Sequence, residues 1–466
     1  MRVAVFLALV ASASAQVSFD TIGWTDRDHQ MYGPAVRYIS NDTLRGIHAV
    51  WKDSLGAICY NFRPRGADWR WLDGIRASPY NRNLGSMDID PASGVACIGF
   101  DFIFRTEPWS AYYEDSAAGA GRFREHVMSR NHRHVITACG RYGSPEFASM
   151  RSDTAFCVSL FTFQRLGHEG PFPAHNISGA RRSGRYAVTW FPVEGSNSCQ
   201  LFMKETPNSG FQWFETVGLS DSIPAAFDHT LTGANALYDS IRLYVIADFF
   251  DGQDRSRSEL WFYAKYDTPP WHLVTAHSVA DPARLGDVAL PCSRPSIARS
   301  LRTSDLFAVW EQFDDANIEP STGLYRASVW AARSQDSGAT WGTPLRLTQP
   351  DQRSWRFPFI ADPISDSLRI ICFPDSVAGY WEQGQGPRAL NPVIMLSLSA
   401  DDLPVAVKEP LAAPDLRTST LPTLAASLDP RFLLYDALGR RAAAPLRPGV
   451  YYARSGATLC RLTLIR

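Results

Sequence analysis

The sequence has little helical periodicity, few lysines and, beyond its first residues, no long apolar run. From residue 17 onward, apolar residues do not recur at the three- and four-residue spacing of an amphipathic helix, which argues against a helical bundle. No later segment reaches the ~20 apolar residues that cross a membrane as a helix. Lysine supplies 4 of the 46 basic residues, and 47 acidic residues bring the formal net charge to -1. We therefore expect no nucleic-acid partner and no membrane span in the mature chain.

Motifs of metal, nucleotide and nucleophile sites are also missing. The eight cysteines form no CxxC pair, and the chain has no P-loop, no GxSxG and no HExxH. We predict no metal and no cofactor. Two alternatives stay open. A metal could bind a histidine cluster at His126, His132 and His134. Calcium could bind an acidic loop at Asp248, Asp251 and Asp254.

Residues 1–15, MRVAVFLALVASASA, have the pattern of a secretory signal peptide. Arg2 is positive, residues 3–11 are a short apolar run, and residues 13–15 form a small-x-small cleavage site. The run is about half as long as a membrane span. The pattern predicts cleavage before Gln16 and an exported mature chain.

The cysteines lie mostly in apolar, strand-like runs such as GAICYNF and RIICFP. This setting favours buried free thiols. Export permits disulfides, and Cys139 with Cys157 is the pairing to test first.

Most of the chain consists of short β-forming runs separated by clusters of Gly, Asp, Asn and Pro. The runs recur as a unit of four strands that opens at Gly33, Leu84, Phe172, Ile223, Arg294 and Phe357, with a weaker unit near His132. A four-stranded sheet buries both faces when several sheets are arranged radially. The pattern predicts an all-β fold, with a β-propeller of six or seven blades over residues 20–400. Two stacked sandwiches are the rival architecture.

Residues 334–341, SQDSGATW, form the most regular turn of this unit. The carboxylate of Asp336 can cap the turn, Gly338 supplies a positive φ, and Thr340 favours the returning strand. With Ser334 and Trp341 these residues match S-x-D-x-G-x-T-W. The motif resembles the Asp box, or bacterial neuraminidase repeat, of sialidase-like propellers, where it is a peripheral turn and does not indicate activity.

Partial copies of the turn occur in register. TPNSGFQW retains Asn208, Gly210 and Trp213, FRPRGADW retains Gly66 and Trp69, and KYDTPPWHL retains Trp271. From Trp69 to Trp213 is 144 residues, or three units of 48, and the next steps are 58 and 70. This spacing favours seven blades over six.

The resemblance implies a site in which three arginines bind a sialic acid carboxylate beside a Tyr nucleophile, a Glu base and an Asp acid. Arginine suits this role because its guanidinium binds a carboxylate through two parallel hydrogen bonds. The candidates in this chain are Arg37, Arg294, Arg356, Tyr380, Glu382 and Asp53. The family's Y/F-R-I-P start is missing, which puts sialidase activity in doubt.

The end of the chain changes composition. Residues 401–431 are rich in Pro, Ala, Asp, Ser and Thr and are expected to form a linker. Two motifs lie near the end, LYDALGRR at 434–441 and RPGVYYAR at 447–454. On the basis of these motifs, residues 432–466 resemble the type A C-terminal sorting domain of type IX secretion substrates. The residues that carry this match are Tyr435, Asp436, Gly439, Arg440, Gly449 and Tyr451.

The predicted tail is a small antiparallel β module with strands over 432–436, from Gly449, and over 458–465. The resemblance implies the type IX secretion machinery as a partner. The alternatives are a fragment of a β-sandwich without a sorting role and a small adhesive module.

We expect a secreted or cell-surface protein of a Gram-negative-type bacterium that passes through the periplasm. A monomeric propeller that binds a glycan or a surface protein without catalysis is the favoured function. The alternative is an exo-acting glycosidase of the sialidase type that hydrolyses terminal sialic acids.

Overall fold

The computed structural model describes residues 16–28, 30, 37–131, 133–139, 145–151, 154–158, 163–168, 174–180, 183–191, 200–208, 212–223, 229–239, 241–252, 254–406, 433–436, 449–455 and 458–464. The chain divides into two compact units, Met1–Ala406 and Val407–Arg466. Within the described residues, the first unit contains seven four-stranded antiparallel sheets and the second contains one three-stranded sheet.

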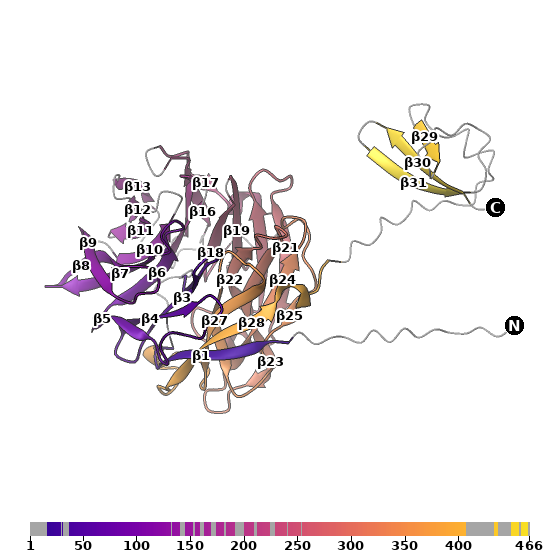
Figure 1. The fold of residues 1–466 in the computed structure, drawn as a ribbon. Coiled ribbons are helices and arrows are strands. Elements are labelled where there is room, and N and C mark those ends of the chain that lie inside the picture. The colour runs from indigo at the N-terminus through magenta and orange to yellow at the C-terminus, as the bar shows by residue number, and fades with distance from the viewer. Residues whose placement is uncertain are drawn as a thin grey trace. The chain divides into compact units, whose positions relative to one another are not determined.

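Each four-stranded sheet forms one blade, and Figure 1 labels its strands. Blade 1 consists of β2 (Ile39–Asp42), β3 (Gly46–Lys52), β4 (Ala57–Pro64) and β5 (Ile75–Asn81), in that order across the sheet. Blade 2 consists of β6 (Asn83–Ile89), β7 (Ala96–Phe104), β8 (Glu107–Asp115) and β9 (Phe123–Arg130). Blade 3 consists of β10 (Arg133–Cys139), β11 (Pro145–Arg151), β12 (Thr154–Val158) and β13 (Phe163–His168). Blade 4 consists of β14 (Ala174–Gly179), β15 (Tyr186–Phe191), β16 (Phe202–Thr206) and β17 (Val217–Gly218).

The remaining blades follow the same order. Blade 5 consists of β18 (Ala234–Asp239), β19 (Arg242–Phe249), β20 (Arg257–Ala264) and β21 (Trp271–Ser278). Blade 6 consists of β22 (Cys292–Arg299), β23 (Leu306–Ile318), β24 (Tyr325–Ser334) and β25 (Leu345–Arg346). Blade 7 consists of β26 (Ser354–Ile360), β27 (Ser367–Asp375), β28 (Asn391–Ser399) and β1 (Ser18–Thr25). The helices among the described residues are four short 3-10 turns, η1 (Ser220–Ser222), η2 (Pro282–Leu285), η3 (Trp381–Gln383) and η4 (Ala400–Asp402).

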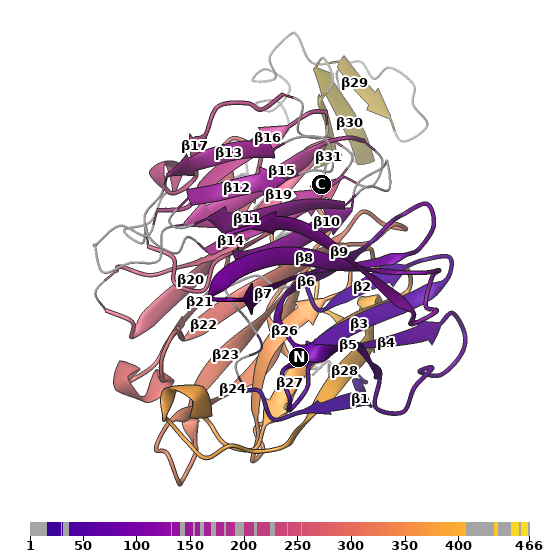
Figure 2. The same ribbon diagram turned by 90° about the vertical axis from the view of Figure 1, so that its left-hand side faces the viewer.

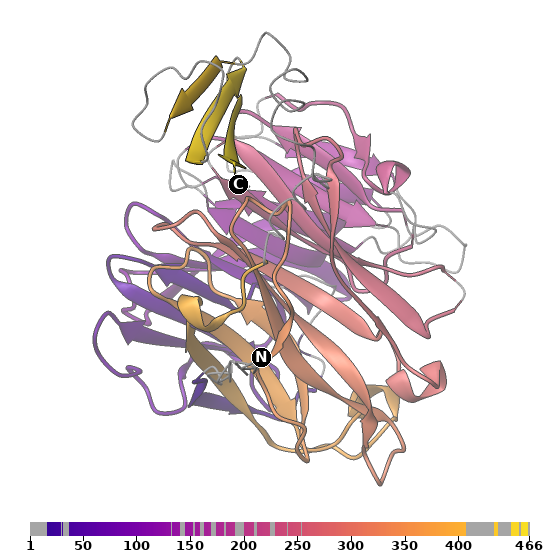
Figure 3. The same ribbon diagram turned by 90° about the vertical axis from the view of Figure 1, so that its right-hand side faces the viewer.

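The first strands of the seven blades form a closed ring. Each contacts the first strand of the next blade, and β26 contacts β2. Figure 2 shows the indigo-to-magenta blades that begin the ring, and Figure 3 shows the orange strands of blade 7 beside the indigo strands of blade 1. The predicted all-β propeller is confirmed, with seven four-stranded sheets.

The N-terminal strand completes the last blade. Strand β1 pairs antiparallel with β28, with Ser18 opposite Ser397 and Thr25 opposite Asn391. This pairing joins residues from the two ends of the propeller in one sheet and covers the edge that β28 would otherwise expose. The repeat pattern in the sequence opens only at Gly33 and did not assign this strand to a blade.

Large side chains on the second strands fill the space between sheets. Trp51 of β3, Trp190 of β15 and Trp310 of β23 are each 0% exposed. They belong to apolar clusters whose members come from neighbouring blades. A sheet that is apolar on both faces buries both only between two others, so these residues favour radial packing.

Side chains also join neighbouring first strands to one another. The Ile297 N–H donates to Asn235 Oδ1 at 3.0 Å, and the Ile360 N–H donates to Ser296 Oγ at 3.2 Å. On the opposite side of the ring, the Thr137 N–H donates to Ser86 Oγ at 2.7 Å. These bonds satisfy buried backbone groups that no strand ladder pairs, which explains polar residues in otherwise apolar strands.

The SQDSGATW turn connects the third and fourth strands of blade 6. Asp336 Oδ1 accepts the Thr340 N–H at 2.8 Å, and Ser334 Oγ accepts the Gly338 N–H at 2.8 Å. Gly338 has a φ of 96°, and a Cβ there would lie 1.9 Å from Phe262 of blade 5. Trp341 contacts the same ring edge to face, at 5.4 Å between centroids. The turn therefore fixes the seam between blades 5 and 6.

The partial copies occupy the equivalent connection in other blades. In blade 4 the Gln212 N–H donates to Asn208 Oδ1 at 2.8 Å, four residues apart as in the blade 6 turn. Trp69 and Trp213 follow the third strands of blades 1 and 4, so the 144 residues between them span three blades as the spacing predicted. Gly210 lies outside the described residues.

The described cysteines Cys59, Cys97, Cys139, Cys292 and Cys372 are buried free thiols. The predicted free state is confirmed for these five, and Cys139 is therefore not paired with Cys157 in this structure. No helix within the described residues is long and apolar enough to cross a membrane.

The second unit contains β29 (Leu433–Asp436), β30 (Gly449–Ser455) and β31 (Thr458–Leu464), ordered β29-β30-β31 and antiparallel. The three strands lie where the sequence predicted them. Tyr435 pairs with Tyr452, and Asp436 pairs with Tyr451. Gly439 and Arg440 lie outside the described residues.

Candidate functional site

Three of the six candidate residues meet around a glutamate that no sequence motif marked. Glu311, on β23, is 0% exposed and forms ion pairs with Arg294 of β22 and Arg356 of β26. The distance from Arg356 Nε to Glu311 Oε2 is 3.0 Å. Arg356 Nη2 also donates to Tyr380 Oη at 2.5 Å. We call these four residues the Glu311 cluster.

Irregular backbone on two first strands aims the arginines at this glutamate. The β22–β23 register shifts between Ser293 and Ser296, and the β26–β27 register shifts between Arg356 and Phe359. Arg294 has a φ of 51°, and Phe357, directly after Arg356, has a φ of 52°. Bulges of this kind redirect a side chain that a regular strand would point elsewhere.

The charges of the cluster compensate one another. Burial would raise the pKa of Glu311, but Arg294 and then Arg356 outweigh it and lower that pKa to about 2. Burial would likewise lower the pKa of Arg356, and Glu311 and then Tyr380 raise it instead. The pKa of Tyr380 is raised by burial. Tyr380 is thus a neutral phenol, and both guanidiniums are committed to one carboxylate.

Burial raises the pKa of two carboxyl groups near the cluster. Burial raises the pKa of Asp28 to about 7, and Asp375 and Glu382 add to this effect. Burial raises the pKa of Asp375 to about 6. Asp28 accepts the Trp381 N–H, and its Oδ1 is buried without a described hydrogen-bond partner. Asp28 thus links the segment after β1 to η3, whereas Asp375 accepts the Val377 N–H and a hydrogen bond from Asn391 Nδ2 of β28.

The other three candidate residues have different partners. Arg37 pairs with Asp88 of β6 at 2.5 Å. Asp53 pairs with Arg76 at 2.7 Å. Asp53 also caps its own turn by accepting the Leu55 and Ala57 N–H groups.

Glu382 pairs with Arg27 at 2.5 Å on a partly exposed surface. The structure therefore brings Arg294, Arg356 and Tyr380 together, whereas Arg37, Asp53 and Glu382 form their ion pairs with Asp88, Arg76 and Arg27.

The histidine alternative for a metal stays untested, because His132 and the side chain of His134 lie outside the described residues. Among the described residues, no group of three His, Cys, Asp or Glu is placed to hold a metal ion. Asp248 is buried and accepts bonds from Thr230 and Thr232, whereas Asp251 and Asp254 bond to their own exposed loop.

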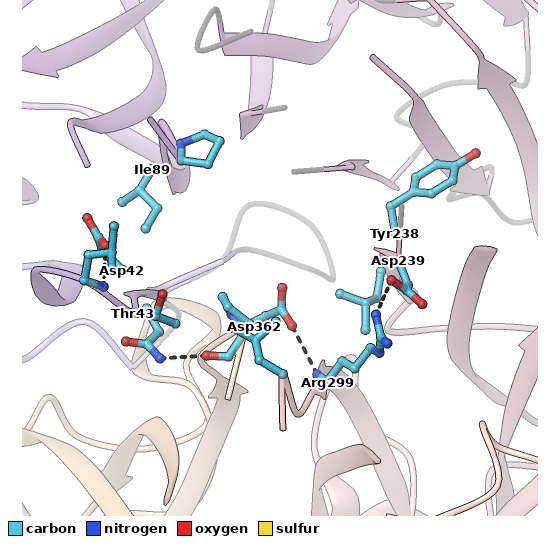
Figure 4. Close-up of a pocket in the computed structure, with 13 residues that line it drawn as sticks. Asp42, Thr43, Ile89, Tyr238, Asp239, Arg299 and Asp362 are labelled. Carbon is cyan, nitrogen blue, oxygen red and sulfur yellow. Dashed lines mark hydrogen bonds and ion pairs between the residues drawn. The ribbon is translucent and has the colours of Figure 1, made fainter. Parts of the chain in front are cut away.

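A cavity of about 270 Å³ opens at the other end of the first strands. Arg294 and Arg299 lie five residues apart on β22, which is roughly 16 Å along a strand, so the cavity and the cluster are well separated. Figure 4 shows the residues that line it, which come from blades 1, 2, 5, 6 and 7. They are Asn41, Asp42, Thr43, Leu44, Ile89, Pro91, Leu237, Tyr238, Asp239, Arg299, Leu301, Asp362 and Pro363. We call this the channel-end cavity.

Hydrogen bonds fix the polar groups of the channel-end cavity. Arg299 pairs with Asp239, and its backbone N–H donates to Asp362 Oδ1 at 3.1 Å. Asn41 Nδ2 donates to Pro363 O at 2.6 Å, which links blades 1 and 7. Leu44 and Leu301, 69% and 51% exposed, add apolar surface beside these groups. The cavity thus offers fixed carboxylates and apolar side chains to one small ligand.

Sequence reasoning missed this cavity because no linear motif encodes it. Its residues lie at the ends of first strands that are far apart in the chain. The one available signal was position, since D or N recurs at these ends in ISND, MDID, YDS and IADP.

No family model matches the chain, and no curated protein matches it. Among solved structures, the lectin BP39L of Burkholderia pseudomallei is 10% identical with a TM-score of 0.49, over 74% of this chain and 94% of the lectin. A polysaccharide lyase, the PL25 ulvan lyase, is 9% identical with a TM-score of 0.49, over 82% of this chain and 96% of the lyase. The Aleuria aurantia lectin is 11% identical with a TM-score of 0.36, over 74% of this chain and 89% of that lectin. Similarity at this level carries no information about what the chain binds.

Proposed function

We propose that the chain is a ligand-binding propeller without catalysis, and that it holds a sugar residue of a glycan in the channel-end cavity. The observation that carries this proposal is the composition of that cavity. Asp42, Asp239 and Asp362 present fixed oxygen acceptors for hydroxyl groups, and Leu44 and Leu301 present apolar surface for the C–H face of a ring. Its volume suits one sugar residue rather than a protein segment.

The state of the Glu311 cluster supports binding rather than catalysis. Arg294 and Arg356 already share one buried carboxylate, so neither guanidinium is free for a substrate carboxylate. Tyr380 is 1% exposed and neutral, whereas a nucleophile needs access to its substrate and activation of its oxygen.

A glycan array followed by calorimetry tests the proposal. The double variant Leu44→Gln, Leu301→Gln keeps side-chain size but removes apolar surface from the cavity. At about 25 cal/mol per Å², losing roughly 60–80 Å² of apolar contact lowers affinity by about tenfold or more. The matched control is Leu55→Gln, Ile241→Gln, because both side chains are exposed turn residues outside the cavity. Equal affinity of the two double variants for every bound glycan would refute this site.

The second candidate function is the exo-acting glycosidase. The convergence of Arg294, Arg356 and Tyr380 favours it. These three were predicted as site residues from the sequence alone, without reference to Glu311. Turnover of a fluorogenic sialoside by the mature chain, lost in Tyr380→Phe, would establish it in place of binding alone.

We further propose that the chain is exported in two steps, through the signal peptide at 1–15 and the β module at 432–466. The three strands of that module form an open sheet, and the backbone of an edge strand is what a receptor strand can pair with. Deletion of residues 432–466 should leave a folded propeller in the periplasm of a type IX-competent host. Equal release of the truncated and full chains into the medium would make the tail an ordinary β module.

A further inference from the structure

A second cavity, of about 240 Å³, lies at the junction where blade 7 meets blade 1. It shares Asn41, Asp42 and Thr43 with the channel-end cavity, so the two hollows have a common wall. Its other charged lining residues are Arg63, Arg65, Asp366 and Arg369. We call this hollow the seam groove.

Positive charge exceeds negative charge in the seam groove. Arg63 is neutralised by Asp20 at 2.9 Å, and Asp42 is neutralised by Arg45 at 2.8 Å. The remaining charges that line the groove are two guanidiniums, of Arg65 and Arg369, and one carboxylate, of Asp366.

Neither Arg65 nor Arg369 has a carboxylate within ion-pair distance among the residues that the structure describes. Arg65 Nη1 has one long hydrogen bond, to Thr43 O at 3.4 Å. No hydrogen bond of the Arg369 side chain to a described residue is found.

Arg369 is the more informative of the two because it is half-buried on β27. Its pKa is lowered by burial and then by the charge of Arg63, and the carboxylates of Asp20 and Asp366 do not offset these effects. A half-buried guanidinium without a partner costs folding free energy, so a purely structural explanation for it is weak. A guanidinium that binds an oxyanion ligand does not need a protein carboxylate and would be impaired by one.

We propose that the seam groove binds the anionic oxygen group of an acidic saccharide, a carboxylate or a sulfate, through Arg369 and Arg65. This site rests on the proposed function in one respect, that the adjoining sugar residue lies in the channel-end cavity. Because the two hollows share Asn41, Asp42 and Thr43, a sugar ring in the channel-end cavity can place its charged substituent in the seam groove.

The test uses matched pairs of charged and uncharged polymers with the mature chain. Polygalacturonate is compared with its methyl ester, and dextran sulfate with dextran, by calorimetry at low and at physiological salt. We expect one charged polymer to bind at least tenfold more tightly than its uncharged counterpart, and the pair that differs identifies carboxylate or sulfate. The difference should shrink with salt.

Variants locate the site. Arg369→Gln should remove the preference for the charged polymer, and Arg65→Gln should reduce it severalfold. Arg105→Gln is the matched control, because it removes one exposed arginine from the β7–β8 hairpin, outside both hollows. Without ligand, the melting temperature of Arg369→Gln should equal or exceed that of the wild type, whereas a structural arginine would lower it.

The outcomes separate this inference from the proposed function. If charged and uncharged polymers bind equally well, and Arg369→Gln changes neither, the anion site is wrong and glycan binding stands. If no polymer binds, but sodium sulfate raises the melting temperature of the wild type more than that of Arg369→Gln, the anion site stands and glycan binding fails. If neither effect is seen, or Arg369→Gln lowers the melting temperature, the inference is overturned.

Discussion

Replacement of Glu311 by glutamine tests whether the Glu311 cluster is a structural ion-pair network. Glutamine keeps the size of the side chain but leaves the guanidiniums of Arg294 and Arg356 buried without a counter-charge. Removing one partner from a buried ion pair costs about 3–5 kcal/mol of unfolding free energy. The pKa of Glu311 supports this size, since the difference between 4.5 and about 2 corresponds to about 3 kcal/mol.

The same pKa determines whether the unfolding free energy rises or falls with pH. Because the folded-state pKa lies below the unfolded value of 4.5, the stabilisation is fully present above about pH 5. It is lost as the pH falls toward 2, where the folded state also binds the proton. The wild type should therefore lose stability over this acid range, and Glu311→Gln should lose less over the same range.

Urea denaturation followed by tryptophan fluorescence measures both effects, with the slope of the transition checked for a change in cooperativity. Glu382→Gln is the control, since its pair with Arg27 is partly exposed and is worth about 0–1 kcal/mol. Adding Arg356→Met to Glu311→Gln should restore part of the lost stability by removing one uncompensated charge. A Glu311→Gln protein within about 1 kcal/mol of the wild type at pH 7 would contradict this reasoning.

Three further perturbations follow from the fold. Asp28→Asn should raise the unfolding free energy by about 1–2 kcal/mol at pH 8, discounted for partial exposure. The gain should fade below pH 4, because a folded pKa near 7 makes the wild type lose stability as the pH rises from 3.8 to 7; a gain independent of pH would point to packing instead. Gly338→Ala should lower the unfolding free energy by about 2–4 kcal/mol, because φ is 96° and the new Cβ would overlap Phe262. An unchanged urea midpoint would refute the tight packing between blades 5 and 6. A chain that begins at Asp26 lacks β1 and exposes the edge of β28, so size-exclusion chromatography should show aggregates rather than a stable monomer.

The repeat could be predicted because it is local. Each unit carries its own turn residues and its own apolar strands, so Trp69, Trp213, Trp271 and Trp341 mark the same connection in four blades. The closing strand could not be predicted in the same way. Residues 18–25 have an ordinary strand pattern, and their pairing with residues 391–397 depends on ring closure rather than on local sequence.

The candidate site was predicted only in part. Arg294 and Arg356 were recognisable from their places beside strand openings, but their partner Glu311 is one of 47 acidic residues. Its signal was an acid flanked by apolar residues in VWEQF, which requires a counter-charge if the strand is buried. The channel-end cavity had only the recurrence of Asp or Asn at strand ends as a signal, because its groups meet only when blades 1, 2, 5, 6 and 7 surround one channel.

Ligand binding in the channel-end cavity can be observed in a crystal structure of the mature chain with a saturating amount of a glycan found on the array. We predict an intact, uncleaved sugar residue in that cavity, with hydroxyl groups bonded to Asp239 or Asp362 and a ring face against Leu44 or Leu301. Sugar bound at Arg294, Arg356 and Tyr380 with the Glu311 ion pairs broken, or a cleaved product there, would contradict the proposed function.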